Sequence, residues 1–298
     1  MSTVDETLTP AADGAASGYR AHRTLSFGTE FRRQLTRRRT QWTLALLALL
    51  PVALYIAFTV GAGDSNTDSG SDSPNAFALA DVGTVSAANF TLFALLVSSG
   101  FLLVVVFALF NGDTVAGEAG WGSLRYLLAT PVPRGRLLAV KYAVGLVYSL
   151  IAMAILTVAS LVVGTLAYGW KPLSAPLGGE VAATDAFWRI LAVAGYLTVT
   201  LLVVASLALL MSVSTDAPLA AVGGAVMLQI VSNILNAVTA LGDIRDVLPT
   251  RYSQAWLGLL STPVQTDEMV RGIVTSLAYA VVFSVWAFIH FQRKDITS

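Results

Sequence analysis

The sequence predicts an all-α integral membrane protein with six transmembrane helices and both chain termini in the cytoplasm. Of the 298 residues, 55% are hydrophobic and only 12% are charged, and the mean hydropathy is +0.71. An average soluble domain carries about 25% charged residues, so this chain has too little polar surface to cover a water-soluble globule of its size. Two further observations support the prediction: long uncharged stretches, and an uneven placement of basic residues.

Six stretches are long and apolar enough to cross a bilayer. A helix needs roughly 20 apolar residues to cross a hydrocarbon core of about 30 Å. Aspartate, glutamate, lysine and arginine are absent from all six, and each would cost about 2.5–3.5 kcal/mol at mid-membrane. The runs are continuous rather than alternating, which favours helices over barrel strands. The expected spans lie at residues 42–61, 90–110, 142–168, 190–213, 218–241 and 272–289.

The basic residues give the orientation. Of the 18 lysines and arginines, 13 fall before the first span, between spans two and three, or after the sixth span. The positive-inside rule therefore predicts that both termini are cytoplasmic and that the protein is a multi-pass protein of the plasma membrane.

The N-terminal segment is expected to have two parts. Residues 1–25 are small and polar and indicate a disordered cytoplasmic leader, whereas residues 26–298 form a single permease domain. Phe27, Phe31 and Leu35 recur every four residues, which on a helix gives one apolar stripe. The run of Arg37, Arg38 and Arg39 suits anionic lipid at the inner membrane face. The alternative to such an interfacial helix is a solvated basic anchor that only sets the topology.

The cytoplasmic segment between spans two and three predicts two short helices. Asp113 is expected to cap the first, Gly120 and Gly122 to end it, and Ser123 to cap the second. The second carries three leucines at positions 124, 127 and 128. A segment that needed only to be soluble would not expose them, so we expect Leu124, Leu127 and Leu128 to face lipid, the spans or a cytoplasmic partner.

This segment resembles the corresponding part of the ABC-2 type transporter permeases. That family has an acidic residue after the second span, then Gly-Thr/Ser-Leu, a leucine pair, Pro-Val and a basic residue. The matching residues here are Glu118, Gly122-Ser123-Leu124, Leu127-Leu128, Pro131-Val132 and Arg134. The chain also ends in Phe291-Gln292-Arg293-Lys294-Asp295, similar to a C-terminal pattern of the family. With the six spans and the basic N-terminal segment, the resemblance covers residues 26–298.

The resemblance implies a half-transporter that pairs with a second permease copy and two ABC ATPase subunits, and by family expectation it is an exporter. The residues expected to couple it to the ATPase are Asp113, Glu118, Leu124, Arg125, Leu127, Leu128 and Arg134. The sequence has no Gly-x-x-x-x-Gly-Lys-Ser/Thr, so ATP and magnesium are expected on the partner chain, and this chain is expected to be no enzyme. We expect no bound cofactor, no metal and no nucleic acid.

Polar residues in the fifth span form a second candidate site. Gln229, Asn233 and Asn236 stand at i, i+4 and i+7 and therefore share one helical face. Amides in hydrocarbon need partners, so this face points into the protein. It either lines the translocation path or forms a packed seam with a second copy, and the nearby Gly223 and Gly224 slightly favour the seam.

The segment between spans five and six is expected on the outer side. It contains an apolar stretch at residues 252–260 that is too short to span the membrane. Tyr252 and Trp256 either belong to an external lid, as in the resembling family, or Trp256 is an ordinary anchor at the membrane interface. We favour the anchor.

Two function classes are excluded by absences in the spans. An intramembrane enzyme would need a catalytic set at depth, and none is present. A self-powered carrier would need an intramembrane carboxylate or an ion site for coupling. The remaining alternative to the transporter is a non-transporting integral membrane scaffold coupled to an ATPase.

Overall fold

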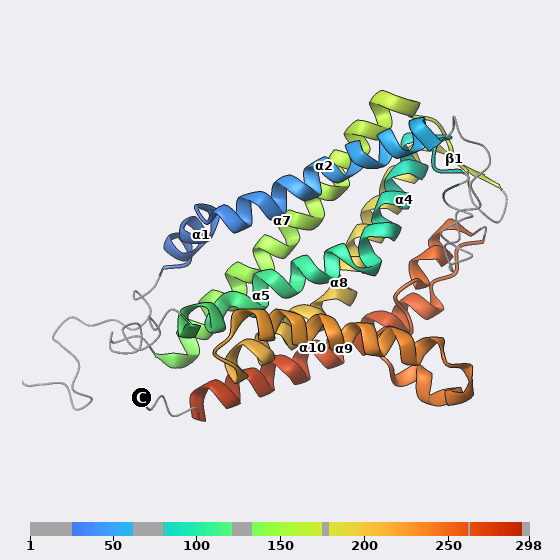
Figure 1. The fold of residues 1–298 in the computed structure, drawn as a ribbon. Helices are drawn as coiled ribbons and strands as arrows, with labels where there is room; N and C mark the ends of the chain where they lie inside the picture. Colours follow the sequence, from blue (N-terminus) through green and yellow to red (C-terminus); the bar gives the residue numbers. More distant parts are fainter. Residues whose placement is uncertain are drawn as a thin grey trace, which may run out of the picture.

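The computed structural model describes residues 26–61, 80, 82–120, 133–174, 179–261 and 263–293, and these are nearly all helical (Figure 1). Six helices are long and apolar enough to cross a membrane. The all-α, multi-pass class that the sequence predicts is therefore confirmed. These six helices are α2 (Arg38–Gly61), α5 (Leu102–Gly120), α7 (Arg134–Tyr168), α8 (Ala183–Ser214), α9 (Pro218–Ala237) and α10 (Asp267–Arg293).

The expected second span is two helices rather than one. The shorter α4 (Ala87–Gly100) precedes α5, and Phe101 between them has φ −142° and ψ −54°, which is not helical. Helix α5 then continues ten residues beyond the expected end at residue 110. Asp113 therefore lies inside α5, and the prediction that it caps a separate short helix is wrong. The helix continues through Gly112 and Gly117, and polar side chains there, such as Asp113 and Glu118, find partners within the protein.

Helices α5 and α8 form the centre of the structure. Helix α8 packs against α10, α5 and α9, while α5 also packs against α9 and α7. Helix α2 lies along α7 at the edge of the bundle (Figure 1). Large apolar side chains on α2, α9 and α10 are exposed, as lipid-facing positions would be.

Helices α5 and α7 approach each other closely around Gly145. A Cβ at this position would lie 2.6 Å from the Asn111 Oδ1 atom, so only glycine leaves room for the neighbouring helix. The Asn111 amide donates to Ser149 Oγ at 3.1 Å and to the Phe107 carbonyl at 2.8 Å. The donor group of this polar side chain thus bonds within its own helix and to the adjacent one, whereas its buried Oδ1 atom has no hydrogen bond among the described residues.

The end opposite α1 is closed by short elements. Strands β1 (Leu173–Ser174) and β2 (Glu180–Val181) pair antiparallel, and the Asn89 amide donates to the Ser174 carbonyl at 2.7 Å. After α9 come two 3₁₀ helices: η2 (Thr239–Val247) packs against α9, and η3 (Ala255–Leu260) packs against α8 and α10.

The tryptophan of η3 is not a membrane-interface anchor. Trp256 is fully buried, and Tyr252 is nearly so, with the Tyr196 hydroxyl donating to its carbonyl at 2.6 Å. An anchor would expose its ring to the headgroup region. The apolar stretch at residues 252–260 instead packs against α8 and α10, where Tyr252, Trp256 and Leu260 are buried.

Candidate functional site

A short helix docks on the end of the bundle where α5 ends and α7 begins (Figure 1). This helix, α1 (Phe27–Leu35), starts at Ser26, whose hydroxyl accepts from the Thr29 N–H at 3.3 Å. The ring of Phe31 stacks on Tyr148 of α7 with centroids 4.9 Å apart, and the Tyr148 hydroxyl donates to the Phe31 carbonyl at 2.8 Å. The predicted helix at this position is therefore present, and it is attached to the protein.

The buried side of α1 is polar, which the sequence pattern did not predict. Glu30 and Gln34 are buried against the bundle, whereas Phe27 and Leu35 are exposed. The expected apolar stripe is thus divided: Phe31 packs on the protein, and the two flanking residues face outward. Because Phe27 and Leu35 are exposed, they are free to contact the membrane interface.

Lys141 of α7 lies between two carboxylates from different helices. Its Nζ atom is 3.0 Å from Glu30 Oε1 of α1 and 2.5 Å from Glu118 Oε1 of α5. Arg33 adds a second cation, 3.0 Å from Glu118 Oε1 and 3.5 Å from Glu30 Oε2. Lys141 and Glu118 are each only 3% exposed, so these charges are held almost entirely out of water.

A neighbouring carboxylate joins the start of α2 to the middle of α5. Asp113 Oδ2 is 3.1 Å from Arg37 and is also paired with Arg39. Gly117, one turn further along α5, leaves the space for this carboxylate, because a Cβ there would lie 2.8 Å from both of its oxygens. We call the seven residues of these pairs the ion cluster: Glu30, Arg33, Arg37, Arg39, Asp113, Glu118 and Lys141.

The ion cluster is held by mutual compensation of charge. Burial by itself would raise the pKa of Glu30, but the Lys141 ammonium, by charge and by hydrogen bond, and then Arg33 and Arg37 hold that pKa below 4.5. Removing one partner from a buried pair typically costs about 3–5 kcal/mol, since the other charge stays uncompensated. The cluster therefore fixes α1 and the adjoining ends of α2, α5 and α7 to one another.

The structure brings together residues that the sequence assigned to two separate sets. Asp113, expected in coupling, contacts Arg37 and Arg39, which were expected to face lipid, while Arg38 is exposed. Glu118 bonds Lys141 and Arg33, and Arg134 donates to the Gln292 carbonyl at 3.4 Å. Leu124, Arg125, Leu127 and Leu128, like the leader at residues 1–25, lie outside the described residues.

Sequence reasoning missed three members of the ion cluster: Glu30, Arg33 and Lys141. Lys141 carried a usable signal, since it is the last charged residue of α7 and is followed directly by the apolar stretch of the third span. A lysine placed there needs a carboxylate partner from another element. Glu30 and Gln34, four residues apart, form the polar face that was assigned to solvent.

A second candidate site lies between α4, α8, α9 and the segment that follows α9. It is a cavity of about 180 Å³ whose lining includes Gln229 and Asn233 of α9, Ser99 beside the α4–α5 break, Thr200 of α8, and Ser253. No charged side chain lines it. Ser99 and Thr200 donate their hydroxyls to carbonyls of their own helices. The amides of Gln229 and Asn233 have no hydrogen-bond partner within the part of the chain that the structure describes, so they remain available to the cavity.

The three amides of the fifth span therefore do not act as one set. Two of them line the cavity, whereas Asn236 does not and keeps its side-chain oxygen without a hydrogen bond among the described residues. This lining fits the expectation of a translocation path for Gln229 and Asn233. Gly224 packs near Met211 of α8, whereas a Cβ at Gly223 would meet nothing within 4 Å. A packed seam between α9 and a second copy of the chain therefore stays a prediction.

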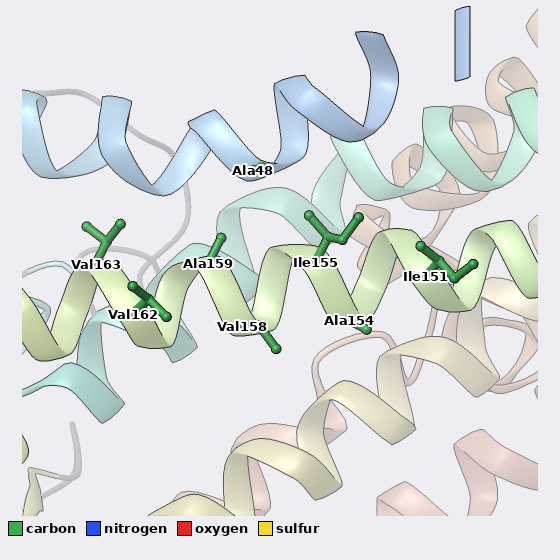
Figure 2. A pocket seen from close by; sticks show the side chains of 8 residues that line it. All are labelled: Ala48, Ile151, Ala154, Ile155, Val158, Ala159, Val162 and Val163. Atoms are coloured by element: carbon green, nitrogen blue, oxygen red, sulfur yellow. The ribbon is translucent and has the colours of Figure 1, made fainter. Parts of the chain in front are cut away.

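A groove between α2 and α7 offers no such chemistry. It has a volume of about 560 Å³ and runs between α2 and α7, where Ala48 faces a row of α7 residues that includes Ile155 and Val163 (Figure 2). Every side chain that lines it is an alanine, valine or isoleucine. In the described part of the chain, no three residues of the types His, Cys, Asp and Glu are grouped so that they could hold a metal ion.

Comparison with known proteins identifies a family and no characterised relative. A family model described as "Protein of unknown function (DUF2705)" matches residues 42–297. No curated protein matches the chain.

Proposed function

This chain belongs to the DUF2705 family, and we propose that it is the membrane-spanning permease subunit of an ATP-driven ABC exporter in the plasma membrane. In this proposal two copies of the chain assemble with two ATPase subunits. Both termini, α1 and the ion cluster lie on the cytoplasmic side, where the positive-inside rule puts them. The residues expected to contact the ATPase lie in the segment between α5 and α7.

The observation that carries the proposal is the ion cluster. It joins α1 to the two helices that flank residues 121–132, the segment that resembles the ABC-2 permeases. A partner that pushes on this segment would meet four helix ends that buried charges hold together. Such a unit transmits a displacement as one body, because separating it would leave charges unpaired out of water.

The cavity supplies the second support. A translocation path needs polar groups in the membrane that are not already committed to the fold, and Gln229 and Asn233 meet this condition. No charged side chain lines the cavity, which is compatible with transport driven by a separate ATPase subunit. An ion-coupled carrier would instead need a titratable or ion-binding group within the membrane. ATP hydrolysis must then occur on another chain, because this one has no P-loop.

Purification from native membranes in mild detergent tests the proposal. We expect an ABC ATPase to co-purify with the chain in equal amounts, and vanadate-sensitive ATP hydrolysis only when it is present. The double variant Leu127→Ala/Leu128→Ala should lower ATPase recovery roughly a hundredfold, since each fully buried leucine contributes about 1.5–3 kcal/mol to docking. The matched control is Leu46→Ala/Leu49→Ala, at exposed positions of α2.

Recovery is normalised to folded permease by size-exclusion chromatography, which separates a docking defect from a folding defect. ATP turnover by the purified chain alone would overturn the proposal. Equal recovery of ATPase with the two double variants would overturn the assignment of the docking surface.

A further inference from the structure

A second groove runs along one face of α10, against the first turns of α7 and the middle of α8. Its volume is about 500 Å³. On α10 it extends from Leu277 to Gln292, and Tyr142, Leu146 and Leu202 line its opposite wall. The groove in Figure 2 is apolar along its whole length, whereas the lining of this one includes Tyr142, Ser284 and Gln292.

The groove covers one leaflet of the membrane. Between Arg271 and Arg293, α10 has no aspartate, glutamate, lysine or arginine, and at 1.5 Å per residue this interval is about 33 Å long. It thus matches a hydrocarbon core of about 30 Å and places Gln292 and Arg293 at its edge. The groove, about 22 Å long by the same measure, reaches from that edge past the middle of the bilayer.

The polarity of the groove changes along its length. Deep in the groove, the Ser284 hydroxyl donates to the Tyr142 hydroxyl at 3.3 Å, so this pair needs no polar ligand. At the edge, the side chains of Gln292 and Arg293 are exposed, and the described residues offer them no hydrogen bond or ion pair. The Arg134 guanidinium also lies here, donating to the Gln292 carbonyl.

An apolar channel whose lining ends at Gln292, next to Arg293 in the chain and bonded by Arg134, complements a lipid with an anionic headgroup. We propose that this groove binds an acidic phospholipid, with an acyl chain along α10 and the phosphate beside Arg293. Basic pockets between transmembrane helices on the cytoplasmic side are suited to such headgroups. A zwitterionic lipid would bring a second cation beside the arginine along with its phosphate, and an apolar helix from a second copy would leave the arginine unmatched.

Native mass spectrometry of the purified full-length protein tests the proposal. The protein is titrated with phosphatidylglycerol and phosphatidylcholine of identical chains, and the bound copies are counted. We expect a preference for phosphatidylglycerol. Arg293→Gln should lower the affinity for phosphatidylglycerol about fivefold, the change that corresponds to about 1 kcal/mol for one cation near anionic lipid. Val285→Trp, which fills the groove from an exposed position, should abolish the most tightly bound copy.

Two controls match these variants. Arg271→Gln removes the same charge at the other end of α10, and Val158→Trp fills the groove of Figure 2 from an equally exposed valine. Neither should change the preference. Equal binding of the two lipids, or equal effects of Arg293→Gln and Arg271→Gln, would overturn the assignment of the headgroup. Loss of dimer mass with Val285→Trp, without loss of lipid, would assign the groove to a second copy instead.

Discussion

Replacing Lys141 with glutamine should release α1 from the bundle. The substitution leaves Glu30 and Glu118 facing each other with only Arg33 between them. Loss of one partner from a buried pair costs about 3–5 kcal/mol. Because Arg33 is 45% exposed and still reaches both carboxylates, we expect the low end, about 3 kcal/mol. The docked state of α1 then becomes roughly a hundredfold less favoured relative to the released state.

Cysteine labelling measures this change, because the chain has no native cysteine. Gln34→Cys places a thiol on the buried face of α1, where it reacts only when the helix leaves the bundle. Its labelling rate reports the fraction of released α1 when docking and release are fast. We expect Lys141→Gln to raise that rate roughly a hundredfold. Arg32→Cys, at an exposed position of the same helix, should label at the same rate in both backgrounds.

A compensated variant distinguishes charge balance from simple loss of packing. In Lys141→Met with Glu30→Gln and Glu118→Gln, no buried charge remains at this position, and such replacements are often neutral or stabilising. Labelling of Gln34→Cys should then return to within a few-fold of its original rate. The reasoning would be refuted if Gln34→Cys were labelled as slowly in the Lys141→Gln background as in the original one. Fast labelling in the compensated variant, with the bundle intact, would refute it as well.

Two further predictions follow from the same structure. The pKa of Glu30 is lowered in the folded state, so its contribution to the docking of α1 is complete at neutral pH and is lost as the pH falls through the folded-state pKa. The distribution of spin-label distances between Arg32→Cys and Lys171→Cys should therefore stay constant near neutral pH and broaden in acid, less so with Glu30→Gln. In sealed cells, an impermeant thiol reagent should label Asn233→Cys through the cavity but not Met227→Cys, which is exposed on the same helix away from the cavity lining. Equal labelling of Asn233→Cys and Met227→Cys would contradict the expectation that the cavity opens to the outside. Labelling of Asn233→Cys only in inverted vesicles would show that the orientation is opposite to the predicted one.

Most of the helices could be predicted because the membrane restricts what the chain can do. Exclusion of charge from about 20 consecutive residues leaves few alternatives to a spanning helix. The break at Phe101 escaped this reasoning, since residues 90–110 are apolar on both sides of it and no proline marks it. The continuation of α5 through Asp113 and Glu118 escaped it for the opposite reason: local polarity predicted a loop, but partners elsewhere in the fold allow a helix.

The sites were predicted less well because they depend on contacts between distant segments. Glu30 and Lys141 are 111 residues apart in the chain, and nothing near either one indicates the other. Gln229 and Asn233 could be placed on one inward face from their spacing alone. Whether that face met a cavity or another helix depended on α4 ending at Gly100, which the pattern did not show.

The two candidate sites lie at opposite ends of α5, and this placement gives the helix a mechanical role in the proposed transporter. Leu102, its first residue, follows the break beside the cavity, and Glu118, near its last, belongs to the ion cluster. The two positions are about 24 Å apart along an uninterrupted helix. A displacement of the cytoplasmic end therefore reaches the cavity through one rigid element, while the break at Phe101 lets α4 stay packed on α7 and α8. Ser99 and Gly100, which precede this break, line the cavity, so in the proposed transporter a movement of α5 relative to α4 would change the cavity at the point where the two helices meet.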